Sequence, residues 1–226
     1  MAMALYEPGL GYYVNGLHKF GATGDFVTAP EQGRLFALAL ARQFDAVAET
    51  LDSDWTVLEL GPGSGMLARA TLLQLEHKPA KYLLLEPSAP LREAQRETLA
   101  DLPEDLRARV EWIAAPPEAK FSGVVIANEV ADALPVERFR IGESQIEQLM
   151  VNVQAGRFAW SSRPARGRLL AAVEHLTEDL VEAPGSGYVS EVCVDLFDWL
   201  ATVTEPLDRG VVLLADYGYP RREYYH

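Results

Sequence analysis

The chain has 226 residues, of which 49% are hydrophobic, so it can bury a substantial core and fits one domain with room for an insertion. Its net charge of −13 argues against binding to a nucleic-acid backbone and tolerates a cationic substrate. A single cysteine, Cys193, excludes an intrachain disulfide, and together with only four scattered histidines it argues against a metal site built from cysteine and histidine.

The amino-terminal thirty residues are rich in glycine and aromatic side chains and end in G-D-F-V-T-A-P. This composition predicts a structured loop without regular helix or strand. The opening M-A-M-A-L-Y-E-P lacks the basic and apolar regions of a secretion signal, and no run of about 18 apolar residues occurs in the chain. We therefore expect no membrane span and a cytoplasmic location.

Strand and helix patterns alternate through the next hundred residues. Apolar residues recur at helical spacing in some segments and form short continuous runs in others. The predicted strands cover 56–61, 81–86, 110–114 and 123–128, and the predicted helices cover 31–50, 64–77 and 88–100. The alternation is typical of parallel βαβ units, with an abbreviated connection at A-P-P-E-A-K-F between the last two strands.

The pattern changes after residue 135. Alternating apolar residues over 136–160 predict a small antiparallel meander inserted in the sheet. We then expect a helix at 167–181, a glycine loop, a helix at 191–204 with Ser190 as N-cap, and a strand at 211–216. Cys193 is interpreted as a small buried residue on that second helix, not as a nucleophile.

The segment V-L-E-L-G-P-G-S-G-M-L, residues 57–67, joins a buried strand to a helix through three glycines. Gly61, Gly63 and Gly65 allow a sharp turn and the close approach of a ligand to the helix amino terminus. A dinucleotide fingerprint would need a third glycine where Met66 stands. With the acidic Glu59 before it, the G-x-G-x-G spacing favours S-adenosylmethionine (SAM), the alternative being an ordinary tight turn.

Two further groups of polar residues follow predicted strands. Glu86, at the end of K-Y-L-L-L-E-P-S, can accept hydrogen bonds from both ribose hydroxyls of a nucleoside, or it can cap the next helix alongside Ser88. In I-A-N-E-V-A-D-A-L-P the polar residues are Asn128, Glu129 and Asp132. They predict a catalytic edge beside the glycine turn, with a local backbone turn as the alternative.

Taken together, these motifs resemble those of the MidA family of class I SAM-dependent methyltransferases. The resemblance rests on G-Y-Y-V-N-G, G-D-F-V-T-A-P-E, E-L-G-P-G-S-G, L-E-P-S, N-E-V-A-D-A-L-P-V, S-E-V and D-Y-G-Y-P-R-R-E-Y-Y-H, in consistent order over nearly the whole chain. It implies a Rossmann-like α/β fold, a mostly parallel twisted sheet with helices on both faces. It also implies a protein-arginine methyltransferase whose substrate exposes an arginine, a respiratory-complex subunit being one candidate.

On the family pattern, the cofactor site comprises Glu59, Gly61, Gly63, Gly65 and Glu86, and the catalytic edge comprises Asn128, Glu129 and Asp132. Asn128 is expected to contact the cofactor as well. A guanidinium stays protonated, so carboxylates must grip it and localise its charge. Glu129 is the first candidate, with Asp132 or Glu191 as partner, although Glu191 could simply favour the dipole of the expected helix. In the amino-terminal loop, Asp25 and Thr28 could close over the cofactor, and Tyr12 and Tyr13 could wall the methyl-transfer site or pack.

We expect one methyltransferase domain over 1–226. It would comprise an amino-terminal cap (1–50), a cofactor-binding core (51–135), a substrate-side insertion (136–190) and a last helix and strand (191–226). Family members usually continue well beyond D-Y-G-Y-P-R-R-E-Y-Y-H, so we expect a truncated sheet with an unpaired edge. Such a chain should be less stable, or more prone to self-association, than a longer version.

Two other classes of function remain open from the sequence. A non-catalytic assembly protein could keep a SAM-binding fold without methyl transfer. A nicotinamide-dependent oxidoreductase would share the strand, the glycines and Glu86, although Met66 counts against it.

Overall fold

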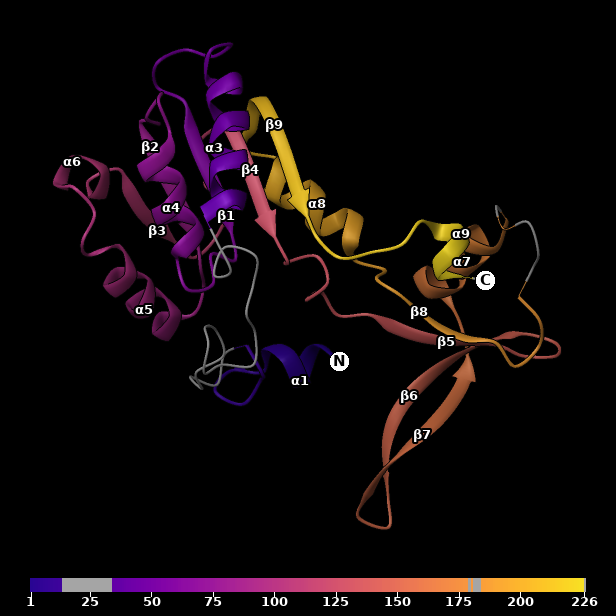
Figure 1. Ribbon diagram of the computed structural model, residues 1–226. Coiled ribbons are helices and arrows are strands. Elements are labelled where there is room, and N and C mark those ends of the chain that lie inside the picture. Colours follow the sequence, from indigo (N-terminus) through magenta and orange to yellow (C-terminus); the bar gives the residue numbers. More distant parts are fainter. Residues whose placement is uncertain (14–33, 179, 181–183, 226) are drawn as a thin grey trace. The chain divides into compact units, whose positions relative to one another are not determined.

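The computed structural model describes residues 1–13, 34–178, 180 and 184–225 (Figure 1). The chain divides into two compact units. The larger unit comprises Met3–Ala133 and Trp199–Asp216, and the smaller unit comprises Met1–Ala2, Leu134–Asp198 and Tyr217–His226. Each unit has its own sheet.

The larger unit is built on a five-stranded sheet in which every pairing is parallel. The strand order is β3-β2-β1-β4-β9, so the chain winds outward from β1 in both directions. The strands are β1 (Thr56–Leu60), β2 (Lys81–Leu85), β3 (Val110–Ile113), β4 (Phe121–Asn128) and β9 (Leu207–Ala215). In such a sheet, ligands bind at the carboxyl ends of the strands where the order reverses, here between β1 and β4. The parallel α/β sheet expected from the sequence is confirmed.

Helices cover both faces of this sheet, and alternate residues of β1 pack against opposite layers of helices. Val57 packs in a core with Phe44 and Leu72, whereas Leu58 packs in a second core with Val203. The first core takes its helical residues from α3, α4, α5 and α6, and the second from α8 (Figure 1). The helices that contribute to this unit are α1 (Ala2–Tyr6), α3 (Arg34–Ala48), α4 (Met66–Gln74), α5 (Ala89–Leu99), α6 (Glu104–Arg107) and α8 (Leu196–Thr204).

The smaller unit contains a four-stranded antiparallel sheet in the order β7-β6-β5-β8. Its strands and helices are β5 (Glu137–Ile141), β6 (Ile146–Gln154), β7 (Arg157–Pro164), β8 (Val189–Val192), α7 (Gly167–Glu178) and α9 (Arg221–Tyr224). Phe139 of β5 is buried against Leu169 and Val173 of α7. The meander is antiparallel as expected, but it is not inserted in the main sheet, because β4 pairs directly with β9 from Phe121 to Asn128.

Three other expectations about secondary structure are wrong. Ser190 caps no helix, because Val189–Val192 forms β8 and pairs with β5, and the helix expected from residue 191 begins at Leu196. A short helix, α1, lies within the segment expected to be a loop. Two further short helices, α6 and α9, were not expected. The connection between β3 and β4, by contrast, contains no helix, as expected.

Candidate functional site at the carboxyl edge of the parallel sheet

The glycine-rich turn after β1 requires backbone conformations that favour glycine. Gly61, Gly63 and Gly65 have φ angles of 55°, 53° and 82°, in the left-handed region. Space is limited as well: a Cβ on Gly61 would lie 3.0 Å from Cγ2 of Val130, and one on Gly65 would lie 3.3 Å from Cγ of Gln95. The turn therefore lies against the segment that follows β4 on one side and against α5 on the other.

Glu59 lies in the core beneath this turn. Its side chain is 2% exposed, and its Oε2 accepts a hydrogen bond of 2.8 Å from the hydroxyl of Tyr82. Burial raises the pKa of the Glu59 carboxyl from 4.5 to about 8, and the hydrogen bond from Tyr82 opposes only part of that shift. The geometry gives Glu59 a direct contact with β2 and makes it largely protonated at neutral pH.

The protonation of Glu59 makes stability depend on pH. The unfolded chain releases the proton near pH 4.5, whereas the folded chain holds it to about 8. The part of the folding stability that depends on this proton is therefore fully present below pH 4.5. Between pH 4.5 and about 8 the free energy of unfolding falls by up to about 1.4 kcal/mol per pH unit. In Glu59→Gln, which keeps an acceptor for Tyr82, we expect urea unfolding to lose this slope. The exposed Glu111→Gln is the control, and equal slopes for wild type and Glu59→Gln would contradict the assignment.

Glu86 follows β2 at the same edge of the sheet and is 4% exposed. Its Oε1 accepts the backbone N–H of Ser88 at 2.8 Å, and its Oε2 accepts Nε2 of Gln95 at 3.3 Å. Burial raises the pKa of Glu86, opposed by these hydrogen bonds and by Arg92. A carboxylate offers about four acceptor positions, so two remain for a ligand. The contact with Ser88, the alternative recognised in the sequence, coexists with that capacity.

Polar side chains also gather where β4 and β9 end. Asn128 is the last residue of β4, and Glu129 follows with φ 53°, its N–H donating to the carbonyl of Ala215 at 2.8 Å. The N–H of Asp132 donates to Oδ2 of Asp216 at 3.1 Å. Burial, then the charges of Asp216 and Glu129, raise the pKa of Asp132. Asp132 is thus close enough to Glu129 and Asp216 for their charges to act on its carboxyl group.

Tyrosines from the amino-terminal segment lie beside these carboxyl groups. The hydroxyl of Tyr6 donates to the carbonyl of Ala133 at 2.7 Å, and its ring stacks on that of Tyr13 with centroids 5.5 Å apart. Tyr12 meets Tyr13 edge-on at 5.2 Å. Burial raises the pKa of Tyr6 to about 12, with contributions from Tyr13 and Asp132. Both possibilities raised for Tyr12 and Tyr13 are compatible with this arrangement, since the rings pack together beside the edge.

The remaining candidate residues belong to the smaller unit or lie outside the described part of the chain. Glu191 is in β8 of the smaller unit, where its Oε1 accepts the hydroxyl of Tyr224 at 3.4 Å and its carbonyl accepts that of Tyr225 at 3.0 Å. It does not begin a helix. Cys193 follows β8, is partly buried and is not on a helix, and burial raises the pKa of its thiol. Asp25 and Thr28 lie outside the described residues.

Sequence reasoning missed two residues of the site. Gln95 is a glutamine in the middle of a helix, and no local pattern shows that it is 0% exposed and bonded to two other elements. Asp216 stands in D-Y-G-Y-P at the end of β9, so its place after an apolar strand was the available signal. In the described part of the chain, no group of three or more His, Cys, Asp or Glu side chains has the arrangement of a metal site.

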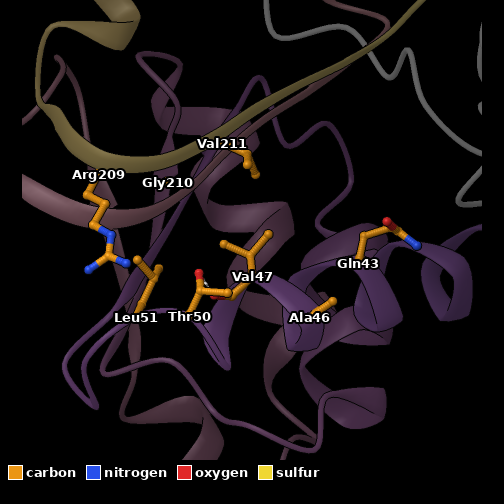
Figure 2. Close-up of a pocket in the computed structure, with 8 residues that line it drawn as sticks. All are labelled: Gln43, Ala46, Val47, Thr50, Leu51, Arg209, Gly210 and Val211. Atoms are coloured by element: carbon orange, nitrogen blue, oxygen red, sulfur yellow. Dashed lines mark hydrogen bonds between the residues drawn. The ribbon is translucent and has the colours of Figure 1, made fainter.

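A pocket of about 360 Å³ lies between α3 and β9, away from this edge (Figure 2). Its lining comprises Gln43, Ala46, Val47, Thr50, Leu51, Arg209, Gly210 and Val211. Gly210 pairs with Gly123, which pairs with Thr56 at the start of β1, so the pocket is at the amino ends of the strands. Ligands of open parallel sheets bind at the opposite ends, and Arg209 alone among the lining residues is charged. We therefore place the candidate site at the glycine turn.

The fold and the site together define the class of protein to which the chain belongs. A parallel sheet whose order reverses beside a glycine-rich turn, with an acidic residue after the next strand, characterises α/β proteins that bind a nucleoside-containing ligand. Residues 35–226 match the family described as "Putative S-adenosyl-L-methionine-dependent methyltransferase", and the chain belongs to this family. The resemblance seen in the sequence is confirmed, and SAM is the cofactor of the family.

Relatives of known structure and curated relatives agree with this membership. A Burkholderia thailandensis protein crystallised with S-adenosyl-homocysteine is 38% identical, with a TM-score of 0.85 over 100% of this chain and 58% of its own. The mitochondrial protein arginine methyltransferase NDUFAF7 homolog of Drosophila melanogaster is 28% identical over 97% of this chain and 56% of its own length. The human NDUFAF7 is 26% identical over 97% and 55%. The chain thus spans little more than half the length of these relatives.

The residues of the edge fit such a ligand. The glycine turn leaves no Cβ between the backbone and an approaching group, and the first turn of α4 follows it directly. Glu86 retains two acceptor positions for vicinal hydroxyls. Gly61, Gly63, Gly65 and Glu86 would therefore hold the cofactor.

Proposed function

We propose that this protein transfers a methyl group from SAM to an arginine side chain of another protein. The observation that carries the proposal is the gathering of Glu129, Asp132 and Asp216 at the strand end beside the glycine turn. Its support from relatives is that NDUFAF7 proteins, at 25–28% identity, are named protein arginine methyltransferases. The cytoplasmic location stays a prediction, and those relatives are mitochondrial by name.

Arginine explains why several carboxyl groups are needed. Its guanidinium has a pKa above about 12, so it arrives charged and offers N–H groups that match a carboxylate fork. Glu129 would bind two of these groups and draw positive charge away from the attacking nitrogen. SAM, when bound, supplies a methyl group activated by the sulfonium. Because catalysis of such an in-line displacement rests mainly on position and electrostatics, no covalent intermediate with the protein is required.

A proton must also leave the nitrogen that is methylated, because the product is again a singly charged guanidinium. Asp132 is the proposed acceptor. Its pKa is raised by burial and by its acidic neighbours, which makes the carboxylate a stronger base for the proton that leaves the substrate nitrogen. The tyrosine rings of Tyr6 and Tyr13 beside it would restrict water and favour a cation over their faces.

Methyl transfer in extract tests the proposal. We expect tritiated SAM and purified protein to label a polypeptide in extract, and mass spectrometry to place the methyl group on arginine. A Gly63→Val protein should give no label. Methylation of lysine, nucleic acid or a small molecule would overturn the arginine assignment. SAM binding without transfer to any acceptor would favour the non-catalytic alternative.

A further inference from the structure

Gln95 makes an unusually complete set of contacts for a glutamine inside a helix. It is fully buried on α5, and its Nε2 donates to the carbonyl of Gly63 at 2.9 Å and to Oε2 of Glu86 at 3.3 Å. Its Oε1 accepts Nε1–H of Trp112, from β3, at 3.0 Å. Both hydrogen atoms on Nε2 therefore have an acceptor, and the side-chain oxygen Oε1 has a donor.

These contacts determine which way the amide points. A flipped amide would set Oε1 against two acceptor oxygens and Nε2 against an indole N–H, which only donates. Leucine or methionine would leave the Gly63 carbonyl, one Glu86 oxygen and the Trp112 N–H without this partner. A glutamate would add a second charge beside Glu86. Glutamine alone among residues of this size satisfies the three neighbours at once.

We propose that Gln95 is a positioning residue that holds the carboxylate of Glu86 at a fixed place against the glycine-rich turn, so that one amide aligns the two parts of the SAM site. The inference rests on the proposed cofactor-binding role of these residues. The same amide nitrogen donates to both Gly63 and Glu86, so movement of either residue distorts a hydrogen bond to Gln95. With Ser88 fixing the other oxygen, the two remaining acceptor positions of Glu86 have a defined direction before ligand arrives.

Charged groups also surround the hydrogen bonds that Gln95 makes with Glu86 and Trp112, and they influence how these bonds respond to pH. From α5, Nη1 of Arg92 donates to the backbone carbonyl of Glu86 at 3.4 Å, and the guanidinium of Arg96 lies 5.0 Å from the ring centroid of Trp112. Burial raises the pKa of Glu86. A second carboxyl in place of the Gln95 amide would share a proton with Glu86 at low pH and repel it once both groups are ionised.

Titration calorimetry with S-adenosylhomocysteine tests the proposal on three variants. Gln95→Leu should lower the affinity at least about tenfold at all pH values, whereas the exposed Gln43→Leu should leave it unchanged. Gln95→Glu should bind within a few fold of wild type near pH 6 and progressively more weakly toward about pH 8.5. The ratio of variant to wild-type affinity removes the titration of the ligand itself.

The pH profile separates positioning from folding. A general packing defect would weaken Gln95→Glu equally at every pH, and that result would overturn the proposal. Wild-type affinity in both Gln95 variants would overturn it too, while leaving the cofactor site intact. If Gln95→Leu folds poorly by circular dichroism, Gln95→Glu, which keeps the shape of the side chain, decides through its profile alone. Failure of wild type to bind S-adenosylhomocysteine would overturn the proposed function together with this role.

Discussion

Gly63→Val should lower the affinity for SAM at least about a hundredfold, equivalent to about 2.7 kcal/mol of binding free energy. The residue has φ 53°, where a β-branched side chain is strained, and its carbonyl accepts the hydrogen bond from Gln95. The added side chain would also stand where the backbone must approach the ligand. Calorimetry with SAM measures the loss directly.

A control separates strain from loss of the site. Gly156, in the turn between β6 and β7, also has positive φ, at 75°, and an added Cβ there meets nothing within 4 Å. Gly156→Val imposes comparable backbone strain in the smaller unit and should keep the affinity for SAM. Unchanged binding by Gly63→Val would mean that the turn does not contact the cofactor.

Glu129→Gln should lower arginine methylation at least about a hundredfold, or about 2.7 kcal/mol of transition-state stabilisation, while SAM affinity stays within a few fold. The substitution keeps size and removes the charge that would hold the guanidinium. Single-turnover rates with a saturating acceptor, together with SAM calorimetry, distinguish the two effects. The exposed Glu118→Gln should change neither quantity.

Near-normal turnover by Glu129→Gln would mean that Asp132 or Asp216 is the main carboxylate that binds the guanidinium. The hydrogen bond between the Asp132 N–H and Asp216 makes these two the next candidates. Silent substitutions at all three positions would rule out a carboxylate grip on the substrate.

The parallel sheet was predictable because its signals are local. Strands buried on both faces have nearly continuous apolar sequences, as in V-L-E-L, and the helices between them have their own spacing. The glycine turn was equally visible, since Gly61, Gly63 and Gly65 occupy positions where positive φ is required. The expected bounds of β1, β2 and β3 are right within one residue at each end.

What the sequence could not predict depends on partners far away in the chain. Val189–Val192 was expected to lead into a helix, and it is a strand because β5 offers an edge with which it pairs. The separate antiparallel sheet follows from the pairing of β4 with β9, about 80 residues later. Gln95 and Asp216 join the site through hydrogen bonds to Gly63 and Asp132, contacts that no periodicity encodes.

A crystal structure with S-adenosylhomocysteine tests the central claim most directly. We expect the two ribose hydroxyls to lie within hydrogen-bonding distance of the Glu86 carboxylate and the amino-acid portion to lie along Gly61–Gly65, with the sulfur facing Glu129. Ligand density at another place, such as the pocket between α3 and β9, or no density at saturating concentration, would contradict the assignment of the site.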